Sequence, residues 1–478
     1  MKRKNTNVPV KILVASATIL IAVILIIVLA SNHFLSNKTT AASANPTGTE
    51  GSDKNAKEKK KSPEEEKAEK KAELLQKADL LAAGYDYDGA IAALQTFDGY
   101  ASDTDITGKI ASYEQIKGTL VAFPVEKVTH IFYHSLIVDP SKAFANHETN
   151  KAAQGMNQWM TTVEEFNKIT QDMYDEGYVL VSIHDLVKEQ KNADGSVSME
   201  KGTIMLPPGK KAFVLSQDDL SYYHSYTGYG IASKLIVDEN GKPVNEYYDA
   251  SGKLLTGAYD VVPLLDKFIE EHPDATYHGA RGIIALTGYN GVLGYRTDES
   301  YKTQPADLNA DKKQWLKDNP DFDLDKERAD AKKVADAMKA EGWEFASHTW
   351  GHLHIDKVSL ESLKTDSNKW KDNVQPIVGN TDVIIFAFGA DLGGAGNYNE
   401  SDAKVALMES MGFRIFCNVD GNPTAGPHFA SHYMRMPRRN LDGYRIYMNS
   451  IGQEHNLSDL FDANQVLDKK RPPVKPLT

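Results

Sequence analysis

The sequence predicts an α/β fold in which parallel strands alternate with helices along the chain. From about residue 124 onwards, apolar runs of strand length alternate with amphipathic segments of helix length, the pattern of βαβ units. Two polar groups directly follow such runs: the pair Asp218 and Asp219, and a stretch that contains His348 and His352. Because functional residues of α/β folds gather at the carboxyl ends of strands, we expect both groups at one edge of the sheet.

Composition limits the class of protein. The 478 residues are enough for one large domain with additions, or for two domains. The formal net charge of -12 argues against nucleic acid as the main partner, because phosphate binding needs a basic face. The single cysteine, Cys417, excludes an intramolecular disulfide and a cysteine-rich zinc site. Its strand-like flanks predict a buried structural residue.

Residues 12–30 form an uncharged apolar run that predicts a transmembrane helix. At about 1.5 Å per residue, the run matches the thickness of a bilayer core. The basic arm at residues 1–11 is expected to stay cytoplasmic, which places the rest of the chain outside the cytoplasm. A cleaved signal peptide is the alternative, but the run is long for one, and small residues suited to cleavage come late. We therefore expect a single-pass protein of the cell membrane.

Two segments separate this run from the main domain. Residues 31–71 are small, polar and charged, and they predict a disordered linker or at most a frayed helix. Within residues 72–123, Leu74, Ala78 and Leu81 recur at helical spacing, and a second helix follows a turn. We predict one helical hairpin of the tetratricopeptide type. Since solenoids need about three repeats, the hairpin is expected to be a spacer or docking element with an unknown partner.

Residues 124–470 are predicted to form the main domain, and residues 471–478 a C-terminal tail. Strands are expected within residues 128–138, 179–187, 211–219, 281–288, 344–352, 382–389 and 414–419. Helices are expected at residues 161–178, 259–273, 325–343, 359–374 and 401–413. Residues 225–258 contain two Gly-ending turns between β-rich runs. We interpret them as an inserted hairpin that rims the cleft and takes part in substrate selection.

The adjacent carboxylates Asp218 and Asp219 repel each other unless something compensates them, so a solvated turn is the simplest interpretation of this pair alone. His348 and His352 are four residues apart, a spacing that can bring both imidazoles onto one metal, although they could also be polar loop residues. His354 is a further ligand candidate, but its spacing points it elsewhere. One carboxylate with two imidazoles is a catalytic type of metal site with open positions. The second carboxylate can then accept a proton from water that the metal activates.

Several segments, in the same order, resemble the metal-dependent polysaccharide deacetylases of carbohydrate esterase family 4. They are "HIFYHSLI", the helix and strand that end in "VSIHDLV", "LPPGKKAFVLSQDD" and "SHTWGH", and the resemblance covers roughly residues 124 to 470. The resemblance implies an incomplete (β/α)7-type barrel. It also implies a divalent metal, most often zinc, and the hydrolysis of N-acetyl groups of amino sugars.

Matched residue by residue, the resemblance implies a role for each polar group. Asp218 corresponds to the general base, and Asp219, His348 and His352 correspond to the metal ligands. His134 stands in the "YHS" position. In branches of the family with a permuted motif order, that histidine is the general acid that protonates the leaving amine.

The chain departs from the family pattern in two loops. The usual "TFDDG" is "SQDDL" here, with Ser216, Gln217 and Leu220 in place of Thr, Phe and Gly. The family's oxyanion loop corresponds to "IFAFGADLGG", in which Ala390 is the candidate backbone donor. Further candidates, with surface positions as the alternative, are the later acids His428 and His432 and the groove residues Arg435, Arg438 and Arg439.

These observations predict an extracytoplasmic deacetylase of an acetylated glycan, such as peptidoglycan or an exported glucosamine polymer. A non-catalytic glycan-binding protein on the same fold remains open, because the two loops are altered. An O-acetyl esterase acting on sugars also remains open, because the same residues serve amide and ester cleavage.

Overall fold

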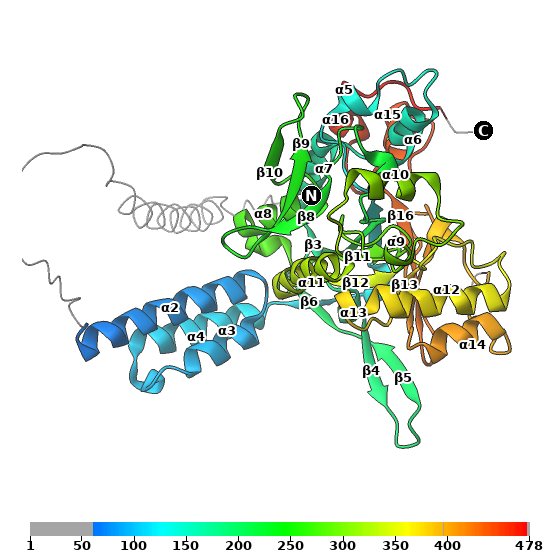
Figure 1. Ribbon diagram of the computed structural model, residues 1–478. Coiled ribbons are helices and arrows are strands. Elements are labelled where there is room, and N and C mark those ends of the chain that lie inside the picture. Colours follow the sequence, from blue (N-terminus) through cyan, green and yellow to red (C-terminus); the bar gives the residue numbers. More distant parts are fainter. Residues whose placement is uncertain (1–60, 395, 476–478) are drawn as a thin grey trace, which may run out of the picture. The chain divides into compact units, whose positions relative to one another are not determined.

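The computed structural model describes residues 61–394 and 396–475, and a ring of seven parallel strands dominates them (Figure 1). The strands follow one another around the ring in chain order. They are β2 (Thr129–Tyr133), β7 (Lys211–Asp218), β11 (Ile283–Leu286), β12 (Glu344–Ser347), β13 (Val383–Ile385), β14 (Ile415–Val419) and β16 (Met434–Asn440).

Strand β7 closes the ring. It pairs with β2 on one side, and on the other side residues Ser216 to Asp218 pair with β11. On the side that faces β11, the first residues of β7, Lys211 to Phe213, pair with β3 (Tyr178–Leu180), which lies outside the ring. The predicted α/β fold with a seven-stranded parallel barrel is therefore confirmed. Contrary to our prediction, the barrel is not incomplete, because backbone pairing joins the strands all the way around.

Helices connect the strands and cover their outer faces. The long ones are α7 (Val163–Asp175), α8 (Val261–Glu271), α11 (Leu324–Glu341) and α12 (Leu360–Asn373). The shorter ones are α5 (Pro140–Ala143), α6 (Lys151–Trp159), α9 (Ser300–Thr303), α10 (Ala310–Asp318), α13 (Gln375–Val378), α14 (Ala403–Ser410), α15 (Gly443–Ser450) and α16 (Ala463–Val466). Most begin with an Asp, Asn, Ser or Thr cap, the residues that satisfy free N–H groups at a helix start.

Strand side chains alternate between the outer face of the ring and its interior, as the two-residue period of a strand requires. On the outer face, Leu215 and Ile284 belong to a cluster that packs against the surrounding helices, and Ile384 and Phe416 belong to a second cluster. Val214, Ile283 and Ala285 belong to the cluster that fills the ring.

Three helices precede the barrel, where we predicted two. They are α2 (Pro63–Ala83), α3 (Tyr87–Gln95) and α4 (Thr104–Lys117). The third helix forms because Asp103 caps it and because Ile106 and Tyr113 bury one face. Residues 63–71, which we assigned to the linker, belong to α2. A proline at the helix start and three glutamates in the first turn favour a helix there.

The three helices share the apolar cluster that fills the ring. Ala78, Ala90 and Leu94 belong to it together with the strand residues. Hydrogen bonds join the two parts as well: the His278 N–H donates to Gly84 O at 2.8 Å, and Tyr85 Oη donates to Asp274 O at 2.8 Å. The helices and the barrel therefore form one continuous core.

The predicted arm and transmembrane helix at residues 1–30 lie outside the described residues, as does most of the predicted linker. Among the residues that the structure describes, no helix is long and apolar enough to span a bilayer. At the other end, Arg471 was assigned to a tail but is buried. Its ion pair with Glu165 has both side chains at 0% exposure, so this part of the tail is anchored in the domain.

The insertion at residues 225–258 is a three-stranded sheet, where we predicted a hairpin. It comprises β8 (Lys234–Val237), β9 (Pro243–Tyr248) and β10 (Leu254–Gly257). The second turn adds the third strand, which pairs with β9. The remaining short strands are β1 (Val121–Phe123), β4 (Val187–Lys191), β5 (Val197–Lys201), β6 (Ile204–Leu206) and β15 (His428–Phe429).

Candidate metal centre

The three predicted metal ligands come together at the carboxyl end of the barrel. Asp219 follows the last residue of β7, and His348 follows the last residue of β12. His352 lies one short loop further on. One ligand atom from each residue lies within 4.8 Å of the others, so a candidate Asp/His/His site is present.

Two of the ligands, His348 and Asp219, have one atom held by a neighbour and another turned to the site. His348 Nδ1 donates to Ile385 O at 2.7 Å, which leaves Nε2 for a metal. Asp219 Oδ1 accepts from Tyr223 Oη at 2.6 Å, and its Oδ2 lies 3.6 Å from His352 Nε2. Two ligands on one tetrahedral zinc ion lie about 3.3–3.5 Å apart. The donor set and its spacing therefore fit a divalent transition metal.

The loops at this end of the barrel hold unusual backbone conformations. Asp219, Thr349, His352 and Phe388 all have φ between 54° and 60°, a region that costs a non-glycine residue roughly 1–3 kcal/mol. Such residues persist only where their surroundings fix them, and they cluster at functional sites.

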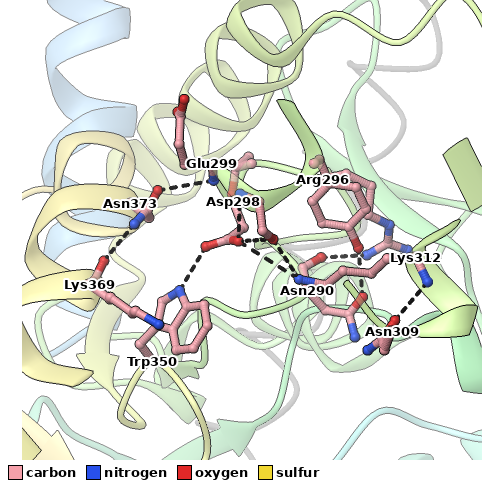
Figure 2. A network of polar contacts seen from close by, with 12 residues as sticks. Asn290, Arg296, Asp298, Glu299, Asn309, Lys312, Trp350, Lys369 and Asn373 are labelled. Atoms are coloured by element: carbon pink, nitrogen blue, oxygen red, sulfur yellow. Dashed lines mark hydrogen bonds and ion pairs between the residues drawn. The ribbon is translucent and has the colours of Figure 1, made fainter. Parts of the chain in front are cut away.

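Helix α12 fixes the loop between the two histidines. The carboxylate of Asp366 accepts from Trp350 N at 2.8 Å and from Gly351 N at 2.7 Å. The Trp350 ring is held as well, because its Nε1 donates to Asp298 Oδ2 at 2.8 Å. Figure 2 shows this bond within a wider network, in which Lys312 lies 3.8 Å from Asp298. The segment that follows β11 thus braces the ligand loop.

Asp218 lies next to the ligands and is 3% exposed. Burial raises the pKa of this carboxyl, but the charges of Arg438 and His348 outweigh burial and lower the pKa to about 2. Arg438 Nη1 donates to Asp218 Oδ1 at 2.7 Å, while Asp218 Oδ2 lies 4.0 Å from His348 Nε2. Asp218 is therefore ionised at neutral pH, the state that a general base needs.

Arg438 is positioned by residues from two other strands. Its Nη1 donates to Ser216 Oγ at 3.2 Å, and its guanidinium lies 4.1 Å from the centre of the Phe132 ring. Ser216 Oγ is also 2.9 Å from His130 Nε2. Burial lowers the pKa of His130 well below its ordinary value, so this imidazole is neutral. The serine that departs from the family pattern thus helps to hold the partner of Asp218.

The other two departures also have partners in the structure. Gln217 Nε2 donates to Asp260 Oδ1 at 2.9 Å, and Tyr222 Oη donates to Asp260 Oδ2 at 2.8 Å. Leu220 is fully buried, and its carbonyl accepts from Leu293 N at 2.9 Å. The turn after the Asp pair is therefore packed differently from a glycine turn while the carboxylates keep their places.

His134 follows β2 at the same end of the barrel and is half-buried. A positive charge on its imidazole acts to lower the pKa of Asp218 and that of Asp442. Asp442 is the buried N-cap of α15, and burial raises its pKa. His134 therefore lies within electrostatic reach of the predicted base and of a second carboxylate, which sequence reasoning missed.

The weaker candidates have partners of their own. The Ala390 N–H donates to Ala387 O at 3.1 Å, so the backbone donor assigned to the oxyanion loop is already used to close a turn. His428 Nε2 lies 2.7 Å from Asn397 Oδ1, and His432 Nε2 lies 3.0 Å from Glu409 Oε1. His354 stacks on an aromatic ring and is not part of the ligand cluster.

The three arginines predicted to line a groove have different partners. Arg438 reaches the site. Arg435 holds the loop after β13 through Asp391, and Arg439 is paired with Asp459. Sequence order gives no signal for these pairings, because the partners are 44 and 20 residues apart.

Comparison with known proteins bears on this site. The model of the polysaccharide deacetylase family matches residues 312–415, which include His348 and His352. No curated protein matches the chain. Among solved structures, the chain is similar to the Streptococcus pyogenes deacetylase PplD in complex with acetate, with 14% identity and a TM-score of 0.33 over 68% of this chain and 94% of that one. It is also similar to BC0361, a polysaccharide deacetylase from Bacillus cereus, with 12% identity and a TM-score of 0.30 over 67% and 65% of the two chains.

Proposed function

We propose that the chain removes N-acetyl groups from amino sugars of a polysaccharide, and the match of residues 312–415 to the model of the polysaccharide deacetylase family supports this proposal. The observation that carries the proposal is the cluster of Asp219, His348 and His352 beside the buried carboxylate of Asp218. Ligands and a separate base in one place are what hydrolysis of an acetamide requires.

The three ligands would hold a divalent metal, and one carboxylate with two imidazoles is a ligand set that suits zinc. When bound, such a metal polarises the acetyl carbonyl and makes a water molecule more acidic. Asp218 takes the proton from the attacking water on Oδ2, because Arg438 occupies Oδ1. His134 gives a proton to the nitrogen of the leaving amine as the bond between carbon and nitrogen breaks. The products are acetate and a free amino sugar.

We also propose that the enzyme acts outside the cytoplasm on peptidoglycan or an exported glucosamine polymer. The support is the uncharged run at residues 12–30, the basic arm before it and the charged segment after it. Protease treatment of intact cells and of broken cells tests this location. Degradation only after lysis would contradict it.

The activity is tested with the full chain purified with its metal. Metal content and acetate release are measured with N-acetylglucosamine oligomers and peptidoglycan fragments. We expect Asp219→Ala and His348→Ala to lose metal and acetate release together. We expect Asp218→Asn to keep the metal and to lose acetate release by a factor of about 10²–10⁴.

Two matched controls separate these effects from general damage. Asp336→Asn changes an exposed carboxylate on α11, and His428→Gln changes an exposed imidazole. Both should keep metal and activity. If Asp219→Ala kept its metal, the ligand assignment would be wrong. If the metal-loaded chain released acetate only from O-acetylated glycans, it would be an esterase. If it released acetate from none of the glycans, it would be a non-catalytic glycan-binding protein.

A further inference from the structure

Phe388 is an exposed aromatic side chain beside the candidate metal centre. Its exposed fraction is 59%, the largest of any aromatic side chain among the exposed large hydrophobic residues of the described chain. The neighbouring Phe386 is completely buried, so the segment after β13 supplies the core with one phenyl ring and presents the other to solvent.

The Phe388 ring lies against two histidines of the ligand loop. Its centre is 4.2 Å from the centre of the His352 ring, which approaches it at an angle of 60°. The His354 ring stacks on it at 3.9 Å with an angle of 2° between the planes. His354 therefore covers one face of the phenyl ring, and His352 contacts the ring as well, while more than half of the residue's surface remains in solvent.

The backbone holds this ring in place. Phe388 has a φ of 60°, which is rare for a bulky residue. The turn is closed by the bond from the Ala390 N–H to Ala387 O. A side chain at Gly389 would meet Val419 at 2.7 Å, so the turn packs tightly on β14. The ring thus stands in a fixed position before any ligand arrives.

We propose that Phe388 is a stacking platform for a pyranose ring of the glycan substrate. The hydrogens on one face of a hexopyranose form an apolar surface, and a flat aromatic face buries that surface with little loss of side-chain freedom. The distance to His352 places the platform within one sugar unit of the metal centre. It therefore takes the acetyl-bearing sugar or the sugar joined to it. This inference rests on the proposed function, and it makes Phe388 a positioning residue that favours glycans over small acetyl compounds.

Binding is measured apart from hydrolysis. The full chain carrying Asp218→Asn, loaded with metal, is titrated by calorimetry with an N-acetylglucosamine tetramer. Adding Phe388→Ala or Phe388→Leu should weaken binding by roughly three- to tenfold, and Phe388→Trp should retain it. In the otherwise unchanged chain, Phe388→Ala should raise KM for the tetramer by a similar factor and change kcat little. Ile451→Ala removes an apolar side chain of similar exposure, 48%, and should have no effect on binding.

Three results would overturn the platform. Equal affinity for the Phe388→Ala chain and its parent would show that the ring does not contact the sugar. Parent-like binding by Phe388→Leu would show that an aromatic face is not needed. Loss of metal in Phe388→Ala would show that the ring supports His352 instead. If no acetylated glycan is hydrolysed, yet binding depends on the Phe388 ring, the proposed function fails while the platform stands.

Discussion

Gln217, the residue before the two adjacent carboxylates, is held by the buried side chain of Asp260. Asp260 is fully buried and accepts hydrogen bonds from Gln217, Tyr222 and the backbone N–H groups of Leu136 and Val261. Burial raises the pKa of Asp260 to about 6 from its ordinary value of 3.8, although these donors act in the opposite direction. The folded chain therefore binds this proton more tightly than the unfolded chain does.

This difference predicts how stability depends on pH. Between about pH 4 and pH 6 the unfolded chain has lost the proton and the folded chain still holds it, so the Asp260 contribution to stability falls as pH rises. Asp260→Asn has no such proton to lose. Relative to the natural chain, the free energy of unfolding of Asp260→Asn should therefore rise by about 2 kcal/mol from pH 4 to pH 7.

Denaturant unfolding of both chains at the two pH values checks this prediction. Asp372→Asn, at an exposed position of α12, is the control and should differ from the natural chain by a constant amount. A constant difference for Asp260→Asn as well would mean that Asp260 is ionised equally in the folded and unfolded chains.

Helix α12 contributes to the site although it supplies no ligand. Its Asp366 accepts the N–H groups of Trp350 and Gly351, which lie between the two histidine ligands. On the other side of the loop, Asp298 holds the Trp350 indole (Figure 2). The loop therefore has its shape before a metal arrives, despite the positive φ of Thr349 and His352.

Loosening this support should weaken metal binding without removing a ligand. Asp366→Asn keeps the shape of the side chain but turns an amide N–H₂ group toward one of the two backbone N–H donors. We expect its metal dissociation constant to rise about 10- to 100-fold, as is typical for groups that orient ligands. Competition with a chelating dye measures it, with Asp372→Asn on the same helix as control. An unchanged constant would mean that the ligand loop keeps its shape without α12.

The barrel and helices α2 to α4 share one apolar cluster, which makes them a single folding unit rather than a domain with a detachable spacer. The hydrogen bond from the His278 N–H to Gly84 O supports the same conclusion. A hairpin that served only as a spacer would have had its own separate core.

Tryptophan fluorescence follows the unfolding of the barrel domain, because all five tryptophans lie within it. It can therefore test whether the helices and the barrel share one core. Leu94→Ala in α3 removes a fully buried side chain and should cost about 2–5 kcal/mol. If the core is shared, tryptophan fluorescence should report the lower unfolding midpoint. Leu80→Ala, at a position 62% exposed, should change stability by less than about 0.5 kcal/mol. If Leu94→Ala does not change the unfolding midpoint measured by tryptophan fluorescence, the helices unfold independently of the barrel.

The sequence alone determined the alternation of strands and helices and the approach of Asp219, His348 and His352. These follow from local periodicity and from the rule that parallel strands end at one edge, neither of which depends on distant contacts. Sequence pattern also named Asp218 as a neighbour of the ligands, because the two carboxylates are adjacent in the chain.

Only the tertiary structure decided what surrounds those residues. The partners of Asp218, Gln217 and the ligand loop are Arg438, Asp260 and Asp366, which lie far along the chain and have no characteristic spacing. The buried Arg471 was missed for the same reason, because its partner Glu165 lies 306 residues away in the sequence. The exposure of Phe388 likewise depends on the turn that packs against β14. The apolar sequence around it does not show which of Phe386 and Phe388 is buried.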